Sequence, residues 1–290
     1  MKVIKTLIPL LISGLVSWLV VIFSTEHVQY TGIVEDLSSW NFFFNVFGVV
    51  YAIVTGFLLV TVLNRYSALS QTLEDELNAI ESIRDFLVYF RDAQREESAG
   101  MKKALARYVR SLSEEEWKQM SEPSVTVNSD TSDELYEIMR SGRVIRAEQS
   151  TDRVVLAAIV ENVSEVTKLR TRRIALSNER LPPRLRILLV FMSVVIATSF
   201  VLLGVRSTAM HVFMVVVLVI SVHLLYMIVE DLDHPFYGVW NVDKTPLEQL
   251  LARFEEELAM NSPDGGKGRG TILYSPVKQK PSGKWGQVCL

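Results

Sequence analysis

The sequence has little cysteine and little histidine, and this scarcity excludes several kinds of functional site. Its single cysteine, Cys289, allows no intramolecular disulfide and no cysteine-based metal cluster. No histidine lies between His27 and His211, so this long segment has no imidazole for acid–base catalysis. The nucleotide-binding sequences G-x-x-x-x-G-K-S/T and G-x-G-x-x-G and the metalloprotease sequence H-E-x-x-H are also absent. These absences predict a protein that is not an enzyme.

Positive charge is scarce in two short connections, and its distribution indicates how the chain lies in a membrane. The connection 25–41 has no lysine or arginine, and the third connection has only Arg206, whereas the insert 64–186 carries 20 of the 30 basic residues. Four apolar runs have about the twenty residues that a helix needs to cross a bilayer: Thr6–Ser24, Phe42–Leu63, Ile187–Val205 and Ala209–Val229. Because basic residues near span ends stay in the cytoplasm, we predict a multi-pass protein of the cell membrane with both termini and the insert in the cytoplasm.

The first apolar run has an alternative interpretation as a cleaved signal peptide, with Lys2 and Lys5 ahead of its apolar part. The run is long, however, and no small-residue cleavage site follows it at 21–28. These two features favour a true span. The insert is nearly neutral, with 20 basic and 21 acidic residues, whereas a nucleic-acid-binding surface needs a basic excess. The expected partners are therefore the lipid bilayer and small ions, and not nucleic acid.

These features predict an all-α integral membrane protein with four transmembrane helices in two pairs and a helical cytoplasmic insert. The predicted segments are a first transmembrane pair at 1–63, the insert at 64–186, a second pair at 187–229, a cytoplasmic segment at 230–260 and a tail at 261–290. The tail is rich in glycine, proline, serine and lysine, which predicts disorder.

Apolar residues at spacings of three and four predict the helices of the insert. From Tyr66 this pattern follows the second span without a proline or glycine, so that span is predicted to continue to about Gln94. Further helices are predicted at 101–120, 133–141, 151–178 and 245–260, with a break at Pro182 and Pro183. The run Glu114–Glu116 is expected on a solvated helix surface, beside one buried aromatic residue, Trp117.

The second span carries small and weakly polar residues on one side of its helix, within an arc of roughly 100°. They are Asn45, Gly48, Ala52, Thr55, Gly56 and Leu59. One hypothesis is close packing of helices, as small residues allow. The other is a pore lining, where small and hydroxyl side chains leave room for ions and water. In an oligomer both can hold along one helix.

Ionisable residues at the fourth span form a second group of candidates. His223 lies deep in the span, so it is a functional candidate, although a neutral histidine bonded to a neighbouring helix is the simpler interpretation. His211 lies near the outer end, where it can face lipid headgroups. After the span come Glu230, Asp231 and Asp233. These acids either face water, with Asp233 capping a turn before Pro235, or bind Ca²⁺, which prefers oxygen ligands.

Several segments together resemble a known family. They are Gly48–Ile83 with Glu76-Leu77-Asn78-Ala79, Tyr108 with Glu116-Trp117, Arg170–Arg173, Leu181-Pro182, and Leu232-Asp233-His234-Pro235-Phe236-Tyr237-Gly238. The last is close to the L-D-x-P-F-x-G signature of the bestrophin-like membrane family, whose domain is otherwise of unknown function. The resemblance covers nearly the whole folded part of the chain. This family is similar to bestrophins in its layout of paired spans around a helical insert.

The resemblance implies a function as well as a fold. Bestrophins are pentameric anion channels gated by Ca²⁺, with the second span lining the pore. By resemblance, Gly48, Ala52, Thr55, Gly56 and Leu59 face a pore, and Glu230, Asp231 and Asp233 correspond to the acidic calcium site. The expected function is an oligomeric ion channel whose cytoplasmic bundle extends the vestibule. The alternative is a non-conducting scaffold or sensor whose bundle binds partners.

Overall fold

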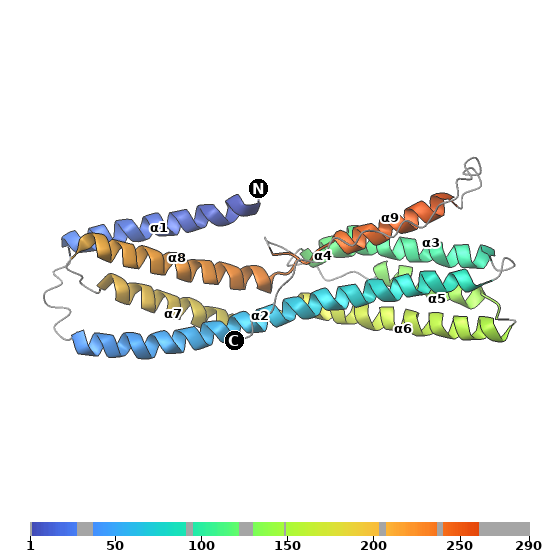
Figure 1. The fold of residues 1–290 in the computed structure, drawn as a ribbon, viewed down its shortest axis with the longest axis horizontal. Helices are drawn as coiled ribbons and strands as arrows, with labels where there is room; N and C mark the ends of the chain where they lie inside the picture. Colours follow the sequence, from blue (N-terminus) through green and yellow to red (C-terminus); the bar gives the residue numbers. More distant parts are fainter. Residues whose placement is uncertain are drawn as a thin grey trace.

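A computed structural model describes residues 2–27, 37–90, 95–121, 130–147, 149–202, 207–236 and 240–260, and the secondary structure in these ranges is helical throughout. Figure 1 shows an elongated molecule with two halves. One half holds α1 (Lys2–His27), α7 (Pro183–Leu202), α8 (Thr208–Asp233) and the first part of α2 (Leu37–Phe86). The other half holds the rest of α2 and the remaining helices. The all-α fold class is thereby confirmed.

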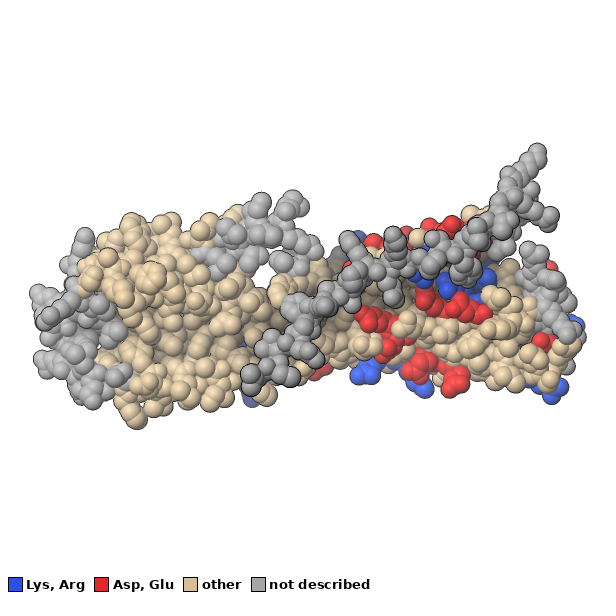
Figure 2. Space-filling model, viewed as in Figure 1, with Lys and Arg blue, Asp and Glu red and all other residues tan. Residues whose placement is uncertain are grey.

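The first half has the surface of a membrane-spanning unit. On the face shown in Figure 2 its described surface is uncharged, whereas acidic and basic side chains gather over the other half. Among the described residues, three helical segments are long and apolar enough to cross a membrane: Phe42–Tyr89, Ser150–Leu202 and Thr208–Asp233. In α1 the corresponding apolar stretch, Leu11–Ser24, is shorter. Three of the four predicted spans are therefore long and apolar enough to cross a membrane, and the span predicted in α1 stays a prediction.

Helix α2 connects the two halves. It continues from the predicted span into the insert, because no proline or glycine interrupts residues 57–86. In the second half it packs along α6 (Ser150–Asn178), and Leu69, Leu73 and Ile80 in this part of α2 are buried. The predicted continuity is correct, but the predicted end near Gln94 is wrong: the α-helix ends at Phe86, and a 3₁₀ turn follows at Leu87–Tyr89.

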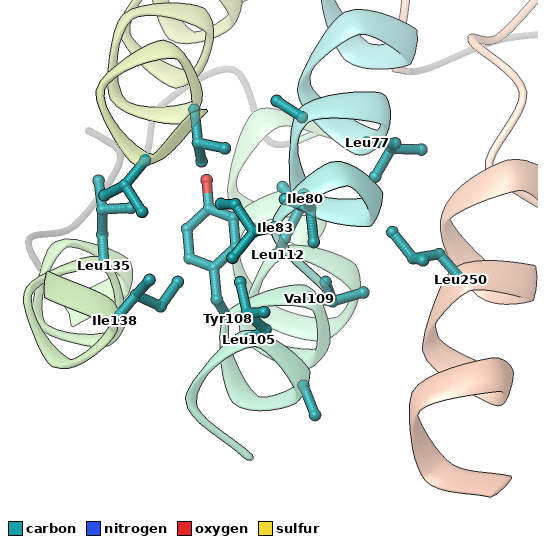
Figure 3. Close-up of a cluster of buried hydrophobic side chains, with 14 of the residues drawn as sticks. Leu77, Ile80, Ile83, Leu105, Tyr108, Val109, Leu112, Leu135, Ile138 and Leu250 are labelled. Atoms are coloured by element: carbon teal, nitrogen blue, oxygen red, sulfur yellow. The ribbon is translucent and has the colours of Figure 1, made fainter. Parts of the chain in front are cut away.

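The bundle is completed by α3 (Arg95–Ser111), a π-helical turn η4 (Leu112–Glu116), α4 (Trp117–Ser121), α5 (Asp130–Val144) and α9 (Thr245–Met260). Figure 3 shows the centre of its core, where Tyr108 and Leu112 lie among side chains from α2 and α5. The predicted bounds of α6 and α9 agree with the structure to within one residue. The predicted helix 101–120 is interrupted by the π turn. The boundaries predicted between segments at 63/64 and 186/187 fall inside α2 and α7.

Helix α1 packs on α8 through small side chains. Ser17, Val21 and Ser24 are buried on the face of α1 that meets α8, and Gly14 lies on the same face. A Cβ atom added to Gly14 would lie 3.2 Å from Cδ1 of Ile220. The absence of a side chain at Gly14 thus allows the two helices to approach closely, as is common in membranes.

A bulky side chain at Gly14 is therefore expected to separate α1 from α8. We predict that Gly14→Leu lowers the free energy of unfolding by about 1–3 kcal/mol, the usual cost of overpacking. Thermal unfolding of the detergent-purified protein measures the change. Val16→Leu, on the exposed side of the same helix, is the matched control and should have little effect. Equal effects of both substitutions would contradict the packing role of Gly14.

Candidate functional site

The predicted stripe on α2 is largely uncovered within one chain. Asn45, Ala52 and Gly56 are exposed, and Gly48 is half-buried. Among the described residues, no heavy atom of a neighbouring element would lie within 4 Å of a Cβ atom added to Gly48 or to Gly56. Within the described part of one chain, no neighbouring helix packs closely on Gly48 or Gly56. Close packing against another copy and a pore lining both stay predictions.

The other two residues of the stripe lie at its edge and turn toward the protein. Thr55 is buried, and its Oγ1 atom has no hydrogen-bond partner among the described residues. Leu59 is half-buried against an apolar cluster that includes Leu58, Val62 and Leu189. Of the six predicted residues, four are thus largely uncovered, and the other two, Thr55 and Leu59, face the inside of the chain.

The bulky apolar residues of α2 form a second exposed face. Ile53 and Phe57 are both 66% exposed, and Val49 and Val60 are exposed beside them. At 100° per residue these four lie on the side of the helix next to the small-residue stripe and away from the buried contacts. Helix α2 therefore presents two chemically different surfaces to its surroundings, one bulky and apolar, the other small and weakly polar.

A cluster of charged groups joins the membrane half to the bundle. Asp233, at the end of α8, is 4% exposed, and its Oδ1 atom accepts a hydrogen bond of 2.7 Å from the backbone N–H of Leu181. Arg186 donates to its Oδ2 atom at 2.8 Å, and Nη1 of Arg65 lies 3.5 Å from Oδ1. Arg180 donates to the backbone carbonyl of Asp233 at 2.7 Å. We call these four charged residues the junction cluster; it connects α2, α7, α8 and the segment between α6 and α7.

The junction cluster bears on the predicted calcium site. Asp233 does not cap the turn before Pro235. Its carboxylate is buried and accepts hydrogen bonds from the backbone N–H of Leu181 and from Arg186. Glu230 lies 3.3 Å from Nε of Arg186, and Asp231 accepts the backbone N–H of Trp240 at 2.7 Å. Within the described ranges no three histidine, cysteine or acidic residues are grouped so that they could hold a metal ion. The calcium site stays a prediction from the resemblance, and the arrangement within one chain adds no support to it.

A second group of charges is buried completely inside the bundle. Arg173 of α6 donates to Glu76 of α2 at 2.6 Å and to Glu116 of η4 at 2.6 Å. Tyr108 of α3 donates to the other oxygen of Glu76 at 2.5 Å, and Arg170 lies 3.0 Å from Glu116. The first four of these residues are 0% exposed. We call these five residues the buried network.

The buried network is electrically balanced, with two arginines and two glutamates. Burial alone lowers the pKa of Arg173, but the carboxylates of Glu76 and Glu116 outweigh it and hold the pKa above its ordinary value. The pKa of Tyr108 is raised well above 10.0, first by burial and then by the charge of Glu76. Arg173 therefore stays charged and Tyr108 stays neutral at physiological pH, and each side chain has a partner in the network.

The π turn explains why Glu116 was assigned wrongly from the sequence. Glu114–Glu116 was expected on a solvated surface, but Glu116 is fully buried and only Glu114 and Glu115 are exposed. A π turn inserts an extra residue into a helix and so rotates the residues that follow it. The burial of Glu76 and Arg173 could have been predicted from the sequence. Glu76 lies between Leu73 and Ile80, and Arg173 follows Leu169, each at the spacing of buried residues on its helix.

An aromatic contact connects the two clusters. Trp117 follows Glu116 directly, and its ring meets that of Phe236 edge to face at 5.1 Å between centroids. Phe236 is buried three residues after Asp233. The predicted burial of Trp117 is correct only in part, because its side chain is half-buried and Lys244 lies over the ring at 5.9 Å.

The two histidines of α8 have separate environments. His211 is buried, contrary to the expectation that it faces headgroups, and its Nε2 atom lies 3.0 Å from the carbonyl oxygen of Phe200. His223 is half-buried, and its buried Nε2 atom has no hydrogen-bond partner among the described residues. The simpler interpretation of His223, a hydrogen bond to a neighbouring helix, is therefore not observed for this nitrogen.

Removing the central arginine should leave two buried carboxylates without their main partner. We predict that Arg173→Met lowers the free energy of unfolding by about 3–5 kcal/mol, the usual cost of breaking a buried ion pair from one side. Denaturant unfolding of the purified protein, monitored by circular dichroism, measures the change. Arg172→Met is the matched control, because Arg172 is exposed on the same helix and should change stability by less than about 0.5 kcal/mol. A mild effect at residue 173 would refute a stabilising role for the network.

Alkaline pH tests the bond from Tyr108 to Glu76. Above about pH 10 the unfolded chain loses the proton of this tyrosine while the folded chain retains it, so the stability that this group contributes falls as pH rises. We predict that Tyr108→Phe costs about 2 kcal/mol at pH 7, where a hydrogen bond to a charged group is lost. Above pH 10, the difference in the free energy of unfolding between this variant and the unmodified chain should become smaller. Tyr136→Phe, at an exposed tyrosine, should show no such narrowing.

Comparisons with known proteins agree with this architecture. The family model described as the bestrophin-like domain matches residues 9–247. A crystal structure of a mutant bacterial bestrophin homologue from Klebsiella pneumoniae is similar with a TM-score of 0.67 at 17% identity, and covers 88% of this chain and 99% of its own. A crystal structure of a variant described as a membrane protein is similar with a TM-score of 0.69 at 16% identity, and covers 87% of this chain and 97% of its own.

No curated protein matches the sequence. The likeness to the crystal structures supports the fold, and the family model covers most of the chain. The predicted resemblance is confirmed: this chain belongs to the bestrophin-like family of membrane proteins.

Proposed function

We propose that the protein is a passive ion channel formed by several copies of the chain, with α2 lining a central pore. The observation that carries the proposal is the pair of unlike exposed faces on α2. The bulky face with Ile53 and Phe57 suits acyl chains, whereas the open face with Gly48, Ala52 and Gly56 offers them little contact area. The small-residue face therefore suits a neighbouring copy or an aqueous path.

The weakly polar groups on this face favour water and ions over packing alone. Asn45 is exposed toward the outer end of the stripe, whereas the hydroxyl of Thr55 at its inner edge is buried inside the chain. An exposed polar side chain at membrane depth is costly against acyl chains and is favourable against water in a pore. Leu59, farther along the stripe, is half-buried against the apolar cluster, so the exposed part of its side chain would form an apolar edge of the path.

One copy cannot enclose a pore with a single helix, so the proposal requires a ring of copies around α2. The resemblance makes five the expected number. Because α2 continues into the bundle, the same ring would extend a vestibule into the cytoplasm, with both chain termini on that side. The fold shared with the bestrophin homologue supports this arrangement.

Cysteine accessibility can test which face of α2 meets water. The only native cysteine is Cys289, so Cys289→Ser gives a background without thiols. We predict that a charged, water-soluble thiol reagent reduces the current of Ala52→Cys and Gly56→Cys channels in planar bilayers. Ile53→Cys and Phe57→Cys are matched controls on the bulky face and should be unaffected.

The same preparation distinguishes the channel from a non-conducting scaffold. An intact oligomer that carries no current in any salt would overturn the channel proposal. Modification at Ile53 and Phe57 with none at Ala52 and Gly56 would instead contradict the assignment of the pore face. A polar substitution at Leu59 should change conductance if this residue narrows the path.

A further inference from the structure

Helix α5 separates its charges between two sides. Its buried side carries Leu135 and Ile138 into the core of the bundle (Figure 3). Next to them, Glu134 and Glu137 form ion pairs with Arg107 of α3. These two glutamates are therefore neutralised inside the chain, and they offer little negative charge to the arginines on the other side of the helix.

The opposite side of α5 is exposed to solvent. Tyr136 is 57% exposed and Met139 is 39% exposed, and the side chains of Arg140 and Arg143 are exposed as well. At 100° per residue these four side chains lie within an arc of about 100°, so they form one surface, which we call the α5 face. Among the described side chains of α5, the one acid on this side is Asp133, near the start of the helix.

The two arginines of the α5 face have no carboxylate partner among the described residues. Exposed cations elsewhere in the bundle are paired inside the chain, as Arg110 is with Glu255 at 2.7 Å. Arg143 lies in the last turn of α5, where the free backbone carbonyls attract a cation, but Arg140 precedes that turn. The α5 face thus presents positive charge that the described part of the chain does not neutralise.

The residue types of the α5 face indicate a protein as its partner. Tyrosine, methionine and arginine are enriched in protein–protein interfaces, and tyrosine and arginine contribute most of the binding energy there. Helix α5 belongs to the half of the molecule whose surface carries acidic and basic side chains, and not to the apolar half (Figure 2). Acyl chains of a bilayer are therefore not the occupant of this face.

We propose that the α5 face binds a short acidic segment of another protein. Carboxylates of the segment pair with the guanidinium groups of Arg140 and Arg143, whose planar forks suit them. An apolar side chain of the segment lies between them and the exposed parts of Tyr136 and Met139. The face extends over seven residues, about 10 Å along the helix, so two turns of a helical segment cover it. The inference does not rest on the proposed channel function.

Fluorescence anisotropy with the full-length protein in nanodiscs of zwitterionic lipid tests the proposal. The probe is a fluorescein-labelled helical peptide with two glutamates and one leucine on one side. We expect saturable binding that Arg140→Gln combined with Arg143→Gln weakens about tenfold, which corresponds to the loss of two exposed ion pairs. Tyr136→Ala should weaken binding as well. Lys103→Gln combined with Arg172→Gln removes the same charge from other exposed positions and should leave binding unchanged.

Three results would overturn the proposal. The first is the absence of saturable binding, and the second is equal weakening by the control pair at residues 103 and 172, which would show unspecific attraction. The third is efficient cross-linking between copies through Arg140→Cys in the Cys289→Ser background, which would show that a second copy covers the face. A peptide with glutamines in place of the glutamates should bind about tenfold more weakly, and equal binding of this peptide would also contradict the role of charge.

Discussion

The pairing of Arg173 with Glu76 and Glu116 is the interaction on which the helical bundle depends. A buried guanidinium is tolerated only if carboxylates neutralise it and its donors are bonded. The two carboxylates come from α2 and from η4, and Tyr108 of α3 completes the coordination of Glu76. Three parts of the chain that are distant in sequence, α2, the consecutive α3 and η4, and α6, must therefore meet at one point. An apolar core alone would permit several registers between α2 and α6, whereas these charges are all satisfied in the observed one.

The junction cluster imposes a similar constraint at the membrane boundary. Asp233 meets Arg65 from α2, Arg186 from α7 and the backbone before α7. The middle of α2, the start of α7 and the end of α8 are therefore fixed around one carboxylate. The contact of Trp117 with Phe236 joins this point to the buried network, because Trp117 follows Glu116. The signature Leu232–Gly238 therefore contributes at least two structural residues, an acid for the arginines and an aromatic ring for the bundle.

The all-α fold class and most of the helices were predictable, because they follow from apolar length and from the spacing of apolar residues. The long α2 was predictable as well, since nothing between residues 57 and 86 breaks a helix. The buried network was not, because a glutamate in a charged run such as Glu114–Glu116 resembles a solvated surface until the π turn rotates it inward. The partners of Asp233 were hidden for another reason: Arg65, Leu181 and Arg186 are distant in sequence, and spacing does not reveal which carboxylate they meet. The candidate pore stripe was visible as a pattern, but its openness required the neighbouring helices.

The continuity of α2 limits how a pore along it can change. Residues 57–86 contain no glycine or proline, and Arg65 and Glu76 tie this part of the helix to the junction cluster and to the buried network. Rotation of the whole helix about its axis would pull Glu76 away from Arg173 and expose an unpaired buried charge, which is strongly unfavourable. Bending is easier farther out, where Gly48 and Gly56 lack side chains and where, in the described part of the chain, no neighbouring helix packs closely on them. Any change in the width of the proposed pore should therefore occur in the outer part of α2, while the inner part keeps the bundle in register.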